Sequence, residues 1–157
     1  MTQSHPVLPL PPSAFIRDIA LDGSLAYVVG WPGWLWVVDV SVPSMPAQVA
    51  LILTPYADLR SVAVADAVAF VAGYPRPSGN PLPDEGQLGP GSLTTYDVGD
   101  PSRPRQAGQI DLPGAPSDLA VTGSMAYVAA GNAGLIAVEV TLPIGPPPAT
   151  ATPAGRE

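Results

Sequence analysis

The sequence predicts an all-β fold made of β-propeller-type blades, about three four-stranded repeats that form a partial or fragment propeller. Three observations lead to this prediction. A two-strand pattern occurs three times, a one-strand pattern follows each copy, and Pro or Gly separates the strands. The 22 Pro and 16 Gly residues interrupt every stretch long enough for a helix.

The first pattern predicts the first two strands of each blade, at residues 17–29, 60–72 and 117–129. Runs such as Tyr27-Val28-Val29 are continuously apolar, which is typical of strands buried on both faces. Asp22-Gly23 and Thr122-Gly123 supply the positive φ angle that a tight hairpin needs, and Asp66 takes the place of Gly in the second copy.

The second pattern predicts a third strand ended by proline, at residues 35–43, 93–101 and 135–143. Asp18 and Asp39 are 21 residues apart, as are Asp118 and Glu139, whereas Ser61 and Asp97 are 36 apart. The second repeat therefore carries 36 − 21 = 15 extra residues. Fourth strands are expected at residues 48–53 and 106–112, and no credible one follows the third copy.

These patterns divide the chain into five parts. Residues 1–11 form an N-terminal segment, in which His5-Pro6-Val7-Leu8 resembles the fourth strand of a preceding blade, since Pro6 stands before it as Pro46 stands before Val49. Repeat 1 spans 12–55, repeat 2 spans 56–113 with an insertion at 75–90, and the incomplete repeat 3 spans 114–143. Residues 144–157 are expected to be a Pro/Thr-rich flexible tail.

Composition argues against several classes of function. All six basic residues are Arg, against 13 acidic residues and a net charge of −7, which disfavours binding to nucleic acid or anionic membranes. No apolar run approaches 18 residues, so no membrane insertion is expected, and residues 1–12 do not have the pattern of a signal peptide. Zero Cys and one His argue against a zinc or redox-metal site and a Ser-His-Asp triad. No cofactor is expected, because no Gly-rich phosphate cradle follows a strand.

At this point the residues support a family resemblance. The segments "RDIALDGSLAYVVG" and "LWVVDVSVPSMP" resemble the LVIVD repeat, found in β-propeller-like proteins of bacteria and archaea. The resemblance covers about residues 12–143, and its specific parts are "AYV" and "VDVS-x-P-x-x-P". It implies a propeller-like fold, a general interaction role and an extracellular or cell-surface location. It implies no catalytic residues.

Three blades are too few to close a propeller, which needs four or more. Three explanations remain open: a fragment of a longer propeller, closure by self-association of two chains into six blades, or an open array.

Fold analogy places the connections between strands two and three, and between strands four and one, on one rim. Loops on a rigid scaffold are where binding usually lies, so this rim is the expected interaction surface. Trp31 and Trp34 could anchor a partner there, whereas Trp36 is expected in the core. The acidic pair Asp84-Glu85 is expected to be solvated rather than to bind a metal. The candidate interaction residues are Trp31, Trp34, Tyr74, Asp84, Glu85, Arg17, Asp18, Arg60 and Asp118.

Asp39, Asp97 and Glu139 recur at one position of the repeat, which favours a structural role as acceptors of backbone N–H groups. The leading functional hypothesis is a non-enzymatic repeat module that binds a protein or a glycan. One alternative is a propeller hydrolase or lyase that uses the rim carboxylates Asp18, Asp58 and Asp118. The other is a purely structural repeat array.

Overall fold

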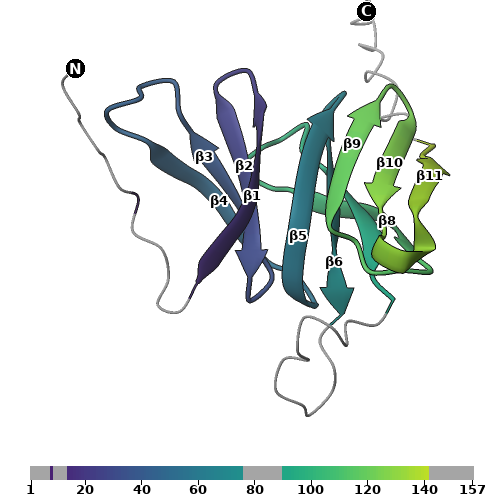
Figure 1. The fold of residues 1–157 in the computed structure, drawn as a ribbon. Helices are drawn as coiled ribbons and strands as arrows, with labels where there is room; N and C mark the ends of the chain where they lie inside the picture. Colours follow the sequence, from purple (N-terminus) through teal and green to yellow (C-terminus); the bar gives the residue numbers. More distant parts are fainter. Residues whose placement is uncertain (1–7, 9–13, 76–89, 142–157) are drawn as a thin grey trace, which may run out of the picture.

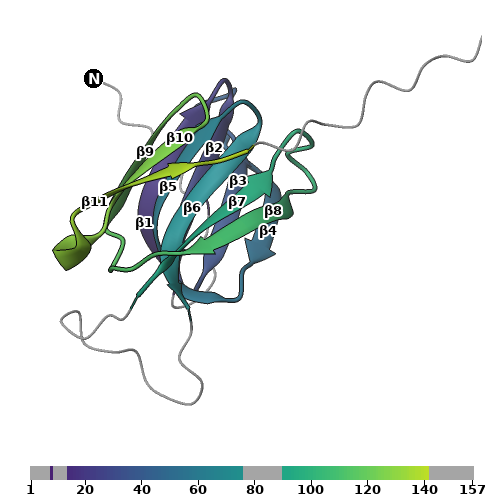
Figure 2. The ribbon, with the colours of Figure 1, turned by 90° about the vertical axis from the view of Figure 1, so that its right-hand side faces the viewer.

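The structure is a computed structural model of the 157-residue chain, and it describes residue 8 and residues 14–75 and 90–141, apart from the side chains of residues 56, 57 and 75. The described residues form three antiparallel sheets, which lie side by side like blades (Figures 1 and 2). Blade 1 contains β1 (Phe15–Asp22), β2 (Leu25–Trp31), β3 (Trp34–Asp39) and β4 (Ala47–Leu53). Blade 2 contains β5 (Tyr56–Ala65), β6 (Val68–Pro75), β7 (Ser92–Asp97) and β8 (Arg105–Asp111), and blade 3 contains β9 (Asp118–Thr122), β10 (Met125–Ala129) and β11 (Leu135–Glu139).

Each sheet is a meander in which neighbours in sequence are neighbours in the sheet. This arrangement confirms the predicted all-β, propeller-type blades, including the fourth strands β4 and β8. Among the described residues, blade 3 has three strands and β11 has no partner on its outer edge. The one helical turn in this part of the chain is the 3₁₀ helix η1 (Gly131–Ala133), and no helix there is long and apolar enough to cross a membrane.

The blades pack face to face, and the same repeat positions point the same way in each. We call the face that carries Tyr27, Phe70 or Tyr127 the leading face, because it points towards the next blade in chain order. The opposite, trailing face carries Val28, Val71 or Val128. These two faces alternate along every strand because successive side chains of a strand point to opposite sides of its sheet.

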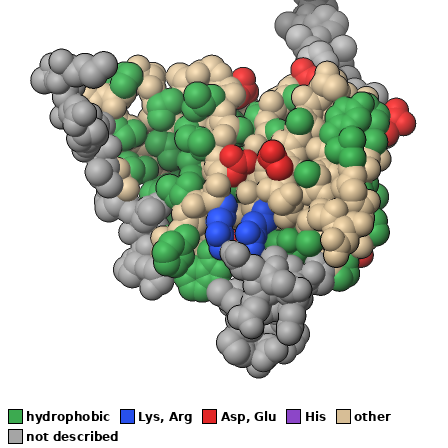
Figure 3. All heavy atoms as spheres, viewed as in Figure 1, with side chains coloured by type: hydrophobic (Ala, Val, Ile, Leu, Met, Phe, Trp, Pro, Cys, Tyr) green, Lys and Arg blue, Asp and Glu red, His purple; other side chains and the backbone are tan. Residues whose placement is uncertain are grey.

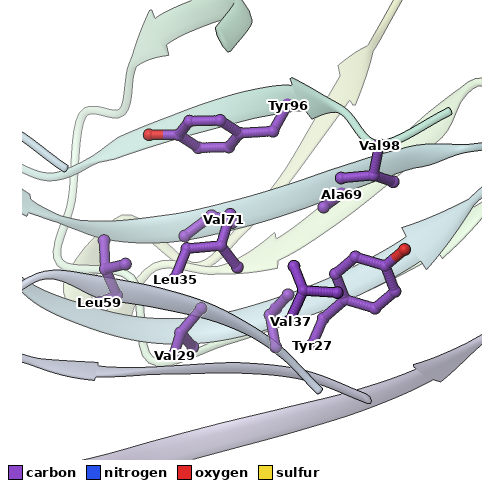
Figure 4. Packing of buried hydrophobic residues seen from close by; sticks show 10 residues of the cluster. Tyr27, Val29, Leu35, Val37, Leu59, Ala69, Val71, Tyr96 and Val98 are labelled. Atoms are coloured by element: carbon purple, nitrogen blue, oxygen red, sulfur yellow. The ribbon is translucent and has the colours of Figure 1, made fainter. Parts of the chain in front are cut away.

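The first core lies between the leading face of blade 1 and the trailing face of blade 2. Figure 4 shows Tyr27, Leu35 and Val37 of blade 1 facing Val71 and Tyr96 of blade 2. The second core repeats this arrangement one blade further on, with Phe70 packed among residues that include Leu119 and Val128 of blade 3. In blade 2, burial on both faces of the central strands, as the continuous apolar runs predict, is therefore achieved by the neighbouring blades.

The first hairpin turn of each blade shows why glycine recurs there. Gly23 and Gly123 have a φ of 56°, a left-handed conformation that glycine adopts without steric cost. In blade 2 the corresponding residue is Asp66, with a φ of 50°, and Ala67 follows with a φ of 60°. Aspartate tolerates this region because its side chain can bond locally, but alanine does not have that compensation.

Replacing Ala67 by glycine is therefore expected to stabilise the protein. The gain should be about 1 kcal/mol, since a left-handed backbone conformation costs an L-residue roughly this amount. Urea unfolding would measure it, with Ala65→Gly in the neighbouring strand as the control that should lose stability instead. An Ala67→Gly variant less stable than the parent would contradict this assignment of strain.

Candidate functional site

The first strands of the three blades bring the predicted rim residues together. β1 packs beside β5 and β5 beside β9, so the starts of these strands lie close to one another. Arginine and acidic side chains accordingly gather over β1 and β5 in the middle of the face shown in Figure 3. Of the predicted rim residues, Arg17, Asp18, Asp58, Arg60 and Asp118 lie in this cluster, whereas Asp84 and Glu85 lie outside the described residues.

Asp58 is the centre of an ion-pair network between blades 1 and 2. Its side chain is buried, and its two carboxylate oxygens lie 3.3 Å from Arg17 Nε and 2.8 Å from Arg60 Nε. The Arg60 pair is a charge contact without hydrogen-bond geometry, because Arg60 Nε makes no hydrogen bond among the described residues. Two arginines therefore neutralise a carboxylate that burial alone would make costly to ionise.

Tyr74 extends this network towards blade 3. The Arg60 guanidinium carbon lies 5.4 Å from the centre of the Tyr74 ring, within range for a cation–π interaction. The Tyr74 hydroxyl donates a hydrogen bond to the Pro116 carbonyl at 3.2 Å. Burial raises the pKa of Tyr74, so its hydroxyl remains a donor at neutral pH. The predicted rim residue Tyr74 is thus a buried bridge between blades 2 and 3.

Asp18 and Ser61 occupy equivalent repeat positions and make equivalent bonds to the next blade. Asp18 Oδ2 accepts a hydrogen bond from the Val62 backbone N–H at 2.9 Å. Ser61 Oγ accepts one from the Leu119 backbone N–H at 3.1 Å. The Ser61 hydroxyl can itself donate to Asp18 Oδ2 at 2.7 Å or to Asp118 Oδ1 at 3.1 Å. We call Asp18, Asp58, Ser61 and Asp118, with Arg17 and Arg60, the inter-blade clamp.

The inter-blade clamp makes the rim carboxylates part of the scaffold. Asp18 is bonded to the next blade, and Asp58 is paired with the preceding blade, so both carboxylates have fixed partners. A catalytic acid or base would instead face a substrate. In the part of the chain that the structure describes, no group of three or more His, Cys, Asp or Glu side chains could hold a metal ion.

Apolar side chains form a second feature, a hollow on the trailing face of blade 1. Its lining includes Phe15, Ile16, Val28, Trp31, Trp34 and Leu51. Trp31 and Phe15 make a tilted ring contact with centroids 6.0 Å apart. Trp31 and Trp34 are half-buried and flank the turn closed by the bond from the Gly33 N–H to the Gly30 carbonyl.

A close approach of β1 to β2 shapes this hollow. A Cβ atom on Gly30 would lie 1.9 Å from the Phe15 carbonyl oxygen, so only glycine fits where β1 bulges between Ile16 and Asp18. Trp36 is buried, as expected, and its indole N–H donates to Gln48 Oε1 at 2.9 Å.

Two of the three recurrent acidic residues have the predicted structural role. Asp39 Oδ1 accepts a hydrogen bond from the Ser41 N–H at 2.8 Å, and Asp97 Oδ1 accepts one from the Gly99 N–H at 2.9 Å. The bond from Ser41 lowers the pKa of Asp39. Glu139 makes no such bond among the described residues, because its longer side chain does not form this two-residue turn.

Sequence reasoning missed two sets of site residues. Ser61 was not among the candidates, although it occupies the same repeat position as Asp18 and Asp118, which was the signal that could have found it. Phe15 and Leu51 in the hollow carried no such signal, since their contact with the tryptophan turn depends on the pairing of β1 with β2 and of β3 with β4.

Comparison with known families identifies a repeat in two parts of the chain. The family model of the LVIVD repeat matches residues 16–54 and 113–143. A search of curated proteins finds no match. Among solved structures, the chain is similar to the crystal structure of the computationally designed Ika4 protein, with a TM-score of 0.41 and 8% identity, over 83% of this chain and 94% of that one.

Proposed function

Because this chain carries LVIVD repeats, at residues 16–54 and 113–143, we propose that it is a non-enzymatic repeat module that binds a protein through the trailing face of blade 1. The observation that carries this proposal is the concentration of exposed apolar side chains there. Five of the nine large apolar side chains found exposed in the described residues belong to β1 and β4 of this blade: Phe15, Ile16, Ile19, Leu21 and Leu53. Contiguous apolar patches on soluble proteins usually mark interaction sites.

The lining of the hollow favours a protein partner over a glycan. Apart from the indole N–H groups of Trp31, Trp34 and Trp36, this lining is aliphatic and aromatic, and the N–H of Trp36 is bonded to Gln48. A glycan presents hydroxyl groups, which need polar partners when they lose water. An aliphatic or aromatic side chain of a protein needs only a complementary apolar surface, and tryptophan is a frequent anchor of such contacts.

The two alternative functions have less support. An enzyme that used Asp18, Asp58 or Asp118 would have to break bonds that hold the blades together. A purely structural array would not require the Trp31–Trp34 turn to present half-buried indoles beside a hollow.

A binding selection would test the proposal. The chain would be immobilised at low density and probed with a phage-displayed library of random peptides and with an array of neutral and acidic glycans. We expect enriched peptides that share an aromatic or aliphatic anchor, and an affinity loss of about tenfold or more for Trp34→Ala, the usual size of a hot-spot truncation. The control Met45→Ala removes an exposed apolar side chain outside the face and should bind as the parent does. Glycan binding that requires Trp34 would overturn the choice of a protein partner.

A further inference from the structure

We propose that the partner of the blade 1 trailing face is the leading face of blade 3 in a second copy of this chain. Two chains would then associate head to tail and close a ring of six blades. This inference rests on the proposed function, because it names the protein that occupies the same surface. Four observations support it.

The first observation concerns one repeat position on the trailing face. Ile19, Val62 and Leu119 are equivalent residues in β1, β5 and β9. Val62 and Leu119 are only 4% and 8% exposed, because the preceding blade covers them, whereas Ile19 is 57% exposed. Ile19 thus lies at an exposed part of the trailing face of blade 1, where no described blade covers it. The centre of this face is buried and packs with Leu8 of the same chain.

The second observation concerns the leading face at the other end of the chain. Leu35 and Leu93 are 0% and 2% exposed, because the following blade covers them, whereas the equivalent Leu135 is 72% exposed. Hydrophobic side chains also gather over β9 and β10 in Figure 3. The two end faces are therefore the two halves of an interface that already occurs twice inside the chain.

The third observation concerns Asp118, the last in the series of side chains that accept a backbone N–H from the next blade. Asp18 Oδ2 binds the N–H of Val62 in the next blade, and Ser61 Oγ binds that of Leu119. Asp118 comes next in this series, and no described residue donates a hydrogen bond to its Oδ2 atom. The equivalent donor in a following blade would be the N–H of Ile19 in the second copy.

The fourth observation is the open outer edge of blade 3. β11 has no outer partner among the described residues, and a hollow beside it is lined by Leu93, Thr95, Ile110, Val138 and Thr141. In the sequence, Ser44-Met45-Pro46 precedes β4, Ser102-Arg103-Pro104 precedes β8, and Ser4-His5-Pro6 repeats this pattern before Leu8.

Leu8 itself packs on the trailing face of blade 1, against Val28 and Trp36. Leu8 therefore lies on the face that the second copy would contact.

Head-to-tail contacts join unlike faces, so they form either a closed ring or an open filament. Light scattering after size exclusion on the full chain would distinguish these outcomes. We expect a dimer of about 32 kDa, twice the 16.0 kDa chain, that persists at high salt, because the contact is apolar and the chains share a net charge of −7. A constant 16.0 kDa monomer at all concentrations would overturn the proposal, as would a mass that grows without limit.

Three variants test the head-to-tail geometry. Ile19→Glu and Leu135→Glu each place a charge in one end face, at positions exposed enough for the chain to fold, which circular dichroism would verify. Each variant alone should be monomeric at concentrations where the parent is a dimer. An equal mixture should recover dimers, because one intact trailing face then meets one intact leading face. Met45→Glu is the matched control, with the same change of charge at a site 74% exposed outside both faces, and it should remain dimeric.

Two results would separate failure of this inference from failure of the proposed function. If Ile19→Glu abolishes the dimer and Leu135→Glu has no effect, the contact joins two trailing faces and the head-to-tail inference is wrong. If the parent is monomeric but binds the selected apolar peptides through Trp34, the proposed function stands and the partner is not a second copy. A monomer that binds no peptide would contradict both.

Discussion

Phe70→Ala is expected to lower the free energy of unfolding by about 3–5 kcal/mol, the usual cost of removing a phenylalanine from a core. Phe70 is 0% exposed and lies between blades 2 and 3, where its contacts include residues of both. The loss of these contacts leaves a cavity that the two facing sheets can only partly close. Urea unfolding monitored by circular dichroism would measure the change.

The repeat supplies a matched control for this variant. Tyr127 occupies the equivalent position in blade 3, but no described blade covers its leading face, and its side chain is partly exposed. In the monomer, Tyr127→Ala should cost less than Phe70→Ala, because part of the Tyr127 side chain is already solvated. Equal losses for Phe70→Ala and Tyr127→Ala, at a protein concentration low enough to prevent association, would show that the leading face of blade 3 is covered within one chain.

Asp58→Ala is expected to destabilise the chain by about 2–3 kcal/mol. This loss is smaller than that of a fully buried ion pair, because the Arg17 side chain is partly solvated. Asp58 is 6% exposed, and its loss leaves Arg60 without the charge that balances it. The unfolding transition by urea would report the effect. Asp58→Asn, which keeps the volume and removes the charge, should lose most of the same stability.

The control for the ion pair is an exposed carboxylate. Asp111→Ala removes an acidic side chain at the end of β8 and should change stability by no more than about 0.5 kcal/mol. If Asp58→Ala were as mild as Asp111→Ala, the inter-blade clamp would contribute little to the packing of blades 1 and 2.

The sequence by itself determined the blades. Continuous apolar runs, glycine or aspartate at the hairpin turns, and proline after each third strand are local features, and each has one structural solution in a β meander. The turns after Asp39 and Asp97 were predictable for the same reason, since the carboxylate and the N–H that it binds are two residues apart.

Only the tertiary structure decided which of these equivalent positions are buried, which bond across blades and which face solvent. Ile19 and Val62 have the same apolar character, yet one is exposed and the other buried, because burial depends on whether a neighbouring blade covers that face. Asp18, Asp58 and Ser61 are likewise ordinary strand residues until the first strands of two blades lie side by side and give each a partner about 40 residues away in sequence. A one-dimensional pattern encodes the repeat that each blade follows. The contacts between blades arise from packing, and they distinguish the end faces of the array from its interior.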